Sequence, residues 1–149
     1  MAERNPDIQL IRDYLAGDRS PRMVESNQLA RALGTEITGY DANRGELRIA
    51  FSPGEAFKQG AGVVQGGAVA AMLDFAMAYA CFTVLPDGST VATTTMSANF
   101  MGAASGDRIE ATGRIDKAGR RVMFASAELR SGGRLVASAT SSLLVLPGG

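Results

Sequence analysis

The hydrophobic pattern of the chain contains one segment that differs from the rest. Residues 66–84 form an almost unbroken apolar stretch whose single charge is Asp74. The stretch is longer than an ordinary strand. A helix that is apolar nearly all round is buried on most sides. The pattern therefore predicts one long, buried helix in the interior of the fold.

On both sides of this stretch the chain has short runs rich in β-forming residues. In residues 46–52, for example, Leu47, Ile49 and Phe51 share one face, which is typical of a half-buried strand. The expected strands are residues 35–40, 46–52, 90–100, 108–116, 121–129 and 134–145. Hairpin turns separate them, so the fold class is α+β. A curled antiparallel sheet around the helix would bury it, and a free sheet edge would allow two chains to pair.

The N-terminal region shows two helix-start signals. Asn-Pro-Asp at residues 5–7 combines an N-cap, a proline at the first helical position and an acid at the positive end of the dipole. We expect this helix to end at about Ala16. Ser-Pro at residues 20–21 repeats the signal and predicts a second helix to about Leu33, before Gly34.

The composition excludes several classes of catalytic site, metal site and binding partner. The 149 residues contain no histidine, one cysteine, and 15 basic and 15 acidic residues. The absence of histidine excludes Ser-His-Asp and Cys-His catalysis and the usual zinc ligand sets, so no metal site is expected. A net charge of zero argues against nucleic acid and anionic membranes as partners. One domain is expected from the length, and we divide it into an N-terminal helical extension, residues 1–34, and a main part, residues 35–149.

The chain shows no signal for export or membrane insertion. Its N-terminus carries charges where a signal peptide needs an apolar core. Residues 63–85 are long enough to span a membrane, but Asp74 would lie near the bilayer centre, where a charge costs at least ~2.5 kcal/mol. We therefore expect a cytoplasmic protein with a buried helix.

The start and middle of the predicted helix hold the candidate chemistry. Gly66 and Gly67 lie where backbone N–H groups have no partner within the helix, and glycine lets a ligand oxygen approach them. Asp74 needs a partner, a solvated cleft or a proton in such surroundings, which favours a functional role. Gln59 and Gln65 flank the preceding loop and carry amides that can orient water or a carbonyl. Structural alternatives are a simple loop-to-helix junction for the glycines and an exposed loop position for Gln59.

These residues together resemble a known family. The series Gln59-x-x-Gly62-x-x-Gln65-Gly66-Gly67, followed by Asp74 in an alanine-rich helix, is similar to that of the hotdog-fold acyl-CoA thioesterases of the PaaI and 4-hydroxybenzoyl-CoA thioesterase type. The similarity covers roughly residues 35–146. It implies a hotdog fold, hydrolysis of an acyl-CoA thioester without a cofactor, and homodimers with active sites at the subunit interface, assembled as a dimer of dimers.

The resemblance also implies roles for individual residues. Asp74 would be the catalytic carboxylate, acting as nucleophile or as general base, and the Gly66 amide would polarise the thioester carbonyl. Gln59 would lie near the nucleophile, contributed by the partner subunit, and Thr93 would help to orient the water. Four basic residues fall near where such enzymes bind coenzyme A phosphates. They are Arg120 and Arg121, joined by Arg114 and Lys117 in a basic hairpin tip.

One position departs from the family. Gln65 stands where the motif has histidine; together with Gly67 it would border the substrate, but it cannot titrate near neutral pH. Two alternative functions therefore stay open. A non-catalytic acyl-CoA-binding hotdog protein would need no carboxylate, so Asp74 counts against it. A hotdog hydratase typically pairs a histidine with a carboxylate, and this chain has no histidine.

Overall fold

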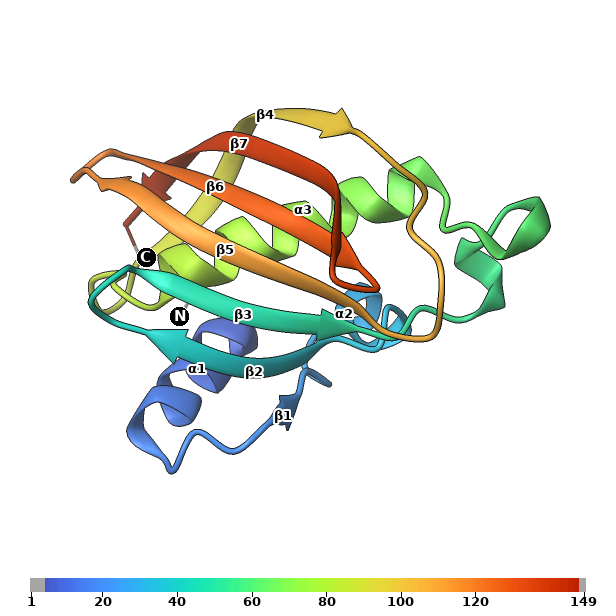
Figure 1. Cartoon of the computed structure of the whole chain (residues 1–149). Coiled ribbons are helices and arrows are strands. Elements are labelled where there is room, and N and C mark those ends of the chain that lie inside the picture. Colours follow the sequence, from blue (N-terminus) through green and yellow to red (C-terminus); the bar gives the residue numbers. More distant parts are fainter. Residues whose placement is uncertain (1–4, 148–149) are drawn as a thin grey trace.

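A computed structural model describes residues 5–147, and its centre is a single long helix. Helix α3 (Gly66–Phe82) lies along the inner side of a strongly curled sheet (Figure 1). Its apolar side chains contact the sheet, and Met72, Leu73 and Met77 are fully buried. The predicted interior helix is confirmed and ends two residues earlier than expected. Among the described residues, no helix is both long and apolar enough to cross a membrane.

The sheet has seven strands, all antiparallel to their neighbours, in the order β1-β2-β3-β5-β6-β7-β4. Their bounds are β1 (Arg22–Met23), β2 (Glu36–Asp41), β3 (Glu46–Phe51), β4 (Thr90–Phe100), β5 (Ile109–Ala118), β6 (Val122–Ser131) and β7 (Arg134–Leu146). The six strands expected from the sequence are present within about two residues of their predicted ends. The long strand β4 forms one edge of the sheet, and the two-residue β1 forms the other.

The sheet approaches α3 most closely at one glycine. On β5, alternate residues face the helix, and among them Ile109 and Ala111 are buried. Gly113 continues this face, and a Cβ placed on it would lie 2.0 Å from the Ala76 carbonyl oxygen. Only glycine fits at this contact, because backbone of the helix occupies the space of a side chain.

The N-terminal region agrees with one prediction and contradicts the other. Helix α1 (Pro6–Ala16) begins at its Asn5 cap and ends before Gly17, as expected. The second helix was predicted from residue 20, which is wrong. The chain there is extended and forms β1 on the edge of β2, and the short α2 (Gln28–Ala32) starts only at Asn27, whose side chain accepts a hydrogen bond from the Ala30 amide. The edge of β2 offers hydrogen-bond partners to residues 22–23, and these residues therefore form a strand. The local Ser-Pro signal contains no information about that edge.

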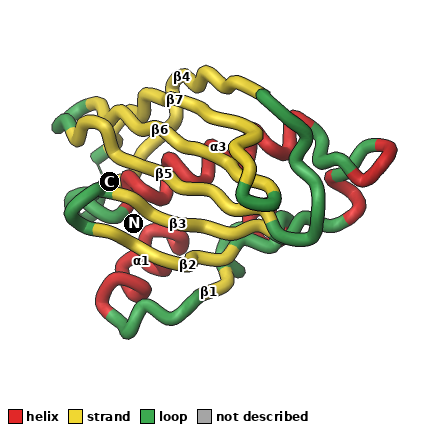
Figure 2. Tube along the Cα trace, in the orientation of Figure 1, coloured by secondary structure: helices red, strands yellow, loops and turns green. Residues whose placement is uncertain are grey.

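The segment between β3 and α3 leaves the body of the molecule as a long loop. It contains two short 3₁₀ helices, η1 (Glu55–Phe57) and η2 (Gly60–Gly62). Figure 2 shows this segment projecting beyond the start of α3. The Gln65 amide donates to the Phe57 carbonyl, which closes the loop on itself, and the Val64 amide donates to the Ala104 carbonyl, which holds its C-terminal end on the body of the molecule. The loop therefore reaches outward from the N-terminus of the central helix.

Candidate active site

The structure brings Asp74 and Thr93 together. Asp74 lies in the middle of α3, and Thr93 lies on the edge strand β4. The Thr93 hydroxyl donates a hydrogen bond of 2.8 Å to Asp74 Oδ1. Asp74 is half-buried and Thr93 is exposed. The only charge of the central helix thus faces the open edge of the sheet and not its closed interior.

Asp74 has no neutralising partner within the described residues. None of the ion pairs formed by residues 5–147 includes it. Its second oxygen, Oδ2, accepts no hydrogen bond from them, and it is not among their buried unpartnered atoms. Structural carboxylates at buried sites are normally paired or fully hydrogen-bonded. Asp74 instead holds one oxygen on Thr93 and leaves the other accessible for chemistry.

The first turn of α3 presents free backbone amides. The Gln65 carbonyl accepts hydrogen bonds from the Ala68 and Val69 amides, whereas the amides of Gly66 and Gly67 donate to no other group among residues 5–147. The Gln65 side chain does not cap the helix. A Cβ on Gly66 would first meet the Phe100 ring, at 4.0 Å, and one on Gly67 would meet nothing within 4 Å. Both amides are therefore open to a ligand oxygen.

Within one chain these two features are too far apart to act on one carbonyl. Gly66 and Asp74 are eight residues apart on a continuous helix, which corresponds to roughly 12 Å along its axis. A thioester carbonyl bound to the Gly66 amide must have the attacking group about 3–3.5 Å from its carbon. These two groups could act on one carbonyl only if they came from two different chains.

Gln59 lies on the projecting loop and makes no contact with Asp74 in its own chain. Its amide donates to the Val63 carbonyl at 2.8 Å, and its side chain is exposed without a hydrogen bond to any described residue. The outward direction of this loop is what a residue contributed to another subunit would need. The role of Gln59 stays a prediction.

The basic residues expected at one hairpin tip separate into two groups. Arg120 and Arg121 lie at the exposed tip between β5 and β6. The Val145 amide donates to the Arg121 carbonyl, and Val145 pairs with Val91 of β4. Arg121 therefore lies beside β7, and β7 lies beside β4. The distance from Arg121 to β4, the strand that carries Thr93, is thus two strand spacings, or about 10 Å. Arg114, in contrast, lies within β5 and forms an ion pair of 3.2 Å with Asp116, so it does not belong to the tip.

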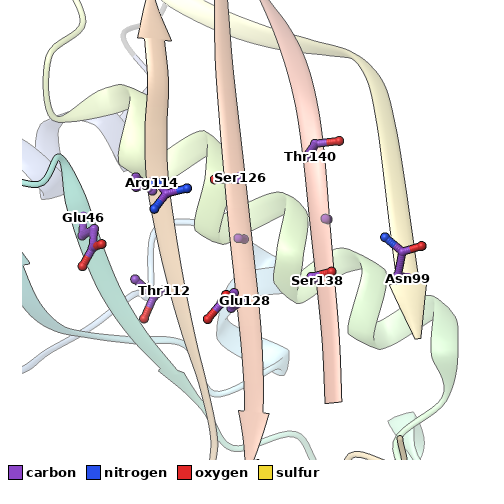
Figure 3. Close-up of a pocket in the computed structure, with 10 residues that line it drawn as sticks. Glu46, Asn99, Thr112, Arg114, Ser126, Glu128, Ser138 and Thr140 are labelled. Carbon is purple, nitrogen blue, oxygen red and sulfur yellow. The ribbon is translucent and has the colours of Figure 1, made fainter. Parts of the chain in front are cut away.

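The outer face of the sheet carries a shallow groove that contains none of the predicted catalytic residues. Figure 3 shows its polar side chains lying on the side of the strands away from α3. The lining residues are Glu46, Asn99, Thr112, Arg114, Ser126, Ala127, Glu128, Ser138, Ala139 and Thr140. The solvated face of an antiparallel sheet is ordinarily polar in this way. The site formed by Asp74 and Thr93 lies on the opposite side.

No pattern in the sequence indicates that a carboxylate of the N-terminal helix is buried. Asp7 of α1, which the sequence predicts only as an acid at a helix start, is 5% exposed and accepts hydrogen bonds from three side chains. The donors are Ser26 at 2.6 Å, Asn27 at 3.1 Å and Tyr79 of α3 at 2.9 Å. Burial, reinforced by the negative charge of Asp7, raises the pKa of Tyr79 far above its usual value. This cluster attaches the N-terminal helix to the central helix.

The lone cysteine is excluded as a nucleophile. Cys81 lies on α3 with no exposed surface. Burial, with a smaller contribution from the charge of Asp116, raises the pKa of its thiol to about 12. A thiol must ionise to act as a nucleophile, so Cys81 remains protonated and inert at neutral pH.

Comparisons with known proteins agree with this architecture. Residues 61–138 match the family described as the Thioesterase superfamily. A Pseudomonas aeruginosa protein named "Putative esterase PA0474" is 34% identical over 119 residues, which cover 79% of this chain and 88% of that protein. A phenylacetic acid degradation-related protein of Ralstonia eutropha JMP134 shares the fold with a TM-score of 0.78 and 29% identity, covering 93% of this chain and 98% of the other. The PaaI protein of Escherichia coli, at 19% identity, has the same fold with a TM-score of 0.74 over 98% of both chains. The hotdog fold and the resemblance to PaaI-type thioesterases are confirmed.

Proposed function

Because this chain belongs to the thioesterase superfamily, we propose that it hydrolyses an acyl-CoA thioester to the free acid and the thiol. The observation that carries the proposal is the geometry of Asp74, whose Oδ1 is held by Thr93 while Oδ2 stays open. Together with the unoccupied Gly66 amide, this arrangement supplies the two groups that thioester hydrolysis needs. The reaction consumes one water: the C–S bond breaks, a C–O bond to the acyl carbon forms, one proton ends on the thiol sulfur, and the acid carries the other.

The Gly66 amide would receive the thioester carbonyl oxygen. Negative charge that develops on this oxygen is stabilised by the amide and by the positive end of the α3 dipole. One such donor is typically worth ~2.7–4 kcal/mol of transition-state stabilisation. Asp74 Oδ2 would either take a proton from water or attack the carbonyl carbon, and in both routes Thr93 keeps the carboxylate oriented.

The separation of Gly66 and Asp74 supports a site shared by two chains. Strand β4 is long and exposed, and no strand within residues 5–147 pairs with its outer side; an edge of this kind pairs readily with a second copy. If two β4 strands pair antiparallel about a twofold axis near Met96 and Ser97, the Thr93 end of one strand lies beside the Phe100 end of the other. Because Phe100 borders Gly66, this pairing would bring the amide of one chain to the Asp74 of the other.

The remaining predicted residues fit around such an interface. The outward loop would carry Gln59 toward the second chain, and Gln65 and Gly67 would border the substrate at the helix start. Arg120 and Arg121, which form no ion pair with residues 5–147, would contact coenzyme A phosphates. The resemblance further supports an assembly in which two dimers associate, and the cytoplasm remains the expected location of the enzyme.

A panel of acyl-CoA thioesters tests the reaction directly. Short, long and aromatic acyl groups should be included, since one relative is named for phenylacetic acid degradation. We expect thiol release with at least one acyl group and none with Asp74→Asn. Binding across the panel without any hydrolysis would support the non-catalytic acyl-CoA-binding alternative.

A mixing experiment tests the shared site. Gly66→Pro removes the amide donor, and proline is well suited to the first helical position; Gln65, at φ −58° and ψ 139°, already has the backbone that precedes a proline. Each of Gly66→Pro and Asp74→Asn alone should be inactive. After unfolding and refolding together, half of the dimers are hybrids with one intact site, so about a quarter of wild-type activity should return. The double variant refolded with itself is the control, and no recovery in the mixture would exclude a site shared between chains.

A further inference from the structure

A β-bulge in the edge strand β4 lies directly beside the candidate site. Thr93 pairs with Leu143 and Thr95 pairs with Ser142, so β4 has one more residue than β7 between these pairs. The extra residue is Thr94. Bulges insert one unpaired residue and are frequent beside active sites, where they re-aim a side chain.

The bulge shifts the inward and outward alternation of β4 by one residue. Before it, Thr93 lies opposite Leu143, and after it, Phe100 lies opposite Ala137. Leu143 and Ala137 are both fully buried on the inner face. An odd and an even position of β4 therefore share this face, which an unbroken strand cannot achieve because its side chains alternate. Without the bulge, Thr93 and Phe100 would not both face α3.

Ser142 of β7 holds the bulge through three contacts. Its backbone oxygen accepts a hydrogen bond of 3.0 Å from Thr94 Oγ1. Its own hydroxyl lies 2.9 Å from Thr94 Oγ1 and 2.7 Å from Thr95 Oγ1. These contacts restrain the two residues that follow Thr93, although Ser142 itself lies on the outer face of the sheet and does not touch Asp74.

We propose that Ser142 is a positioning residue of the thioesterase reaction, which keeps the Thr93 hydroxyl on Asp74 by holding the bulge at Thr94. The inference rests on the proposed function, because the orientation of Asp74 affects turnover only if Asp74 is catalytic. Its physical basis is that a rotation of the backbone at Thr94 turns the adjoining Thr93 away from the carboxylate. Small misplacements of a catalytic group lower the rate strongly while substrate contacts stay in place.

The test compares turnover and substrate binding in the full chain, with the best thioester of the panel. Ser142→Ala should lower kcat roughly 3- to 10-fold and leave KM within about twofold. Combining it with Thr93→Val should give the kcat of Thr93→Val alone, because a hydroxyl that is absent needs no positioning. Ser142→Thr keeps the hydroxyl on a residue that suits a strand and should retain wild-type kcat.

Ser138→Ala provides the matched control. Ser138 lies on the same strand and the same outer face, and its hydroxyl makes no hydrogen bond to a side chain of residues 5–147, so its loss should leave kcat unchanged. Wild-type kcat in Ser142→Ala, alongside an inactive Asp74→Asn, would overturn the inference and leave the proposed function intact. Independent, multiplying losses in the double variant would also overturn it. Full activity of Asp74→Asn would overturn the proposed function and this inference together.

Discussion

Two aspartates in this molecule occupy helices that are in contact, yet they differ in burial and in the hydrogen bonds that they accept. Asp7 of α1 is buried and accepts hydrogen bonds from Ser26, Asn27 and Tyr79. Asp74 of α3 is half-buried at the open sheet edge and accepts one hydrogen bond from residues 5–147, donated by Thr93. Buried acceptors with several donors stabilise a fold. An incompletely bonded carboxylate at an edge has capacity left for a substrate or water.

The difference in hydrogen bonding gives a criterion that separates a carboxylate with a structural role from a candidate for catalysis. Both lie in helices, and both have apolar neighbours in the sequence. The difference is the number of donors that the fold directs at each carboxylate, and whether an oxygen stays accessible. Substitutions at the two sites should therefore affect different measurements.

The largest effect is expected for Asp74→Asn. Loss of a general base or nucleophile should reduce kcat by at least about 1,000-fold. The free energy of unfolding should change by less than about 0.5 kcal/mol, as for a substitution away from the packed core. Thiol release and urea unfolding measure the two quantities. A large loss of stability would assign Asp74 to the same structural class as Asp7.

The converse is expected for Asp7→Ala. Three donors lose their acceptor, among them the buried Tyr79 hydroxyl, and stability should fall by about 3 kcal/mol. Turnover per folded molecule should stay close to that of the wild type, because Asp7 does not touch the site. Urea unfolding, followed by kinetics at a temperature where the variant is folded, checks both statements. Inactivity of a fully folded variant would contradict this separation.

A smaller effect on catalysis is expected for Thr93→Val. The substitution preserves shape and removes the Thr93 hydrogen bond to Asp74, so kcat should fall about 10-fold with little change in KM. Thr93→Ser keeps the hydroxyl and is the matched control. Equal kcat for the valine and serine variants would show that the 2.8 Å hydrogen bond does not contribute to the reaction.

The smallest effect is expected for Tyr79→Phe, which removes one of the three donors to Asp7 and should cost about 1–2 kcal/mol of stability. The pKa of Tyr79 is raised in the folded state by burial and by the charge of Asp7. The contribution of Tyr79 to stability is therefore fully present at pH values below about 10, which is the pKa of a tyrosine in the unfolded chain. It declines at higher pH, because the unfolded tyrosine ionises while the folded one stays protonated. Urea midpoints from pH 8 to 10.5 should fall more in the wild type than in the variant. Parallel curves would show that the raised pKa has no such effect.

Much of the fold was predictable because it depends on local patterns. An apolar stretch of helical length indicated α3, and alternation indicated six strands within about two residues of their observed ends. The Asn5 cap located the start of α1. The helix expected from residue 20 failed, because the strand partner of residues 22–23 lies on β2 and a local signal contains no information about it.

The candidate site was predictable only in part. Asp74 stood out as the single charge of a buried helix, and two adjacent glycines marked the open amides. The family resemblance implied Thr93, but the sequence contains no sign of the bulge beside it, whose Thr94 is hydrogen-bonded to Ser142, 48 residues further along the chain. The Asp7 cluster likewise joins positions 72 residues apart. Contacts between residues so far apart in the sequence produce no periodic pattern of hydrophobic and polar positions.

The sequence by itself determined which segments are buried, where the strands run and which helix carries a charge. These features follow from the order of hydrophobic and polar residues along the chain, whose period differs between helices and strands. The tertiary structure decided which groups face that charge. It placed Asp74 beside Thr93 at the free edge and surrounded Asp7 with three donors. It also brought the backbone of α3 against Gly113 so closely that no side chain fits there. Each of these outcomes depends on how separate segments pack in space, which local pattern does not encode.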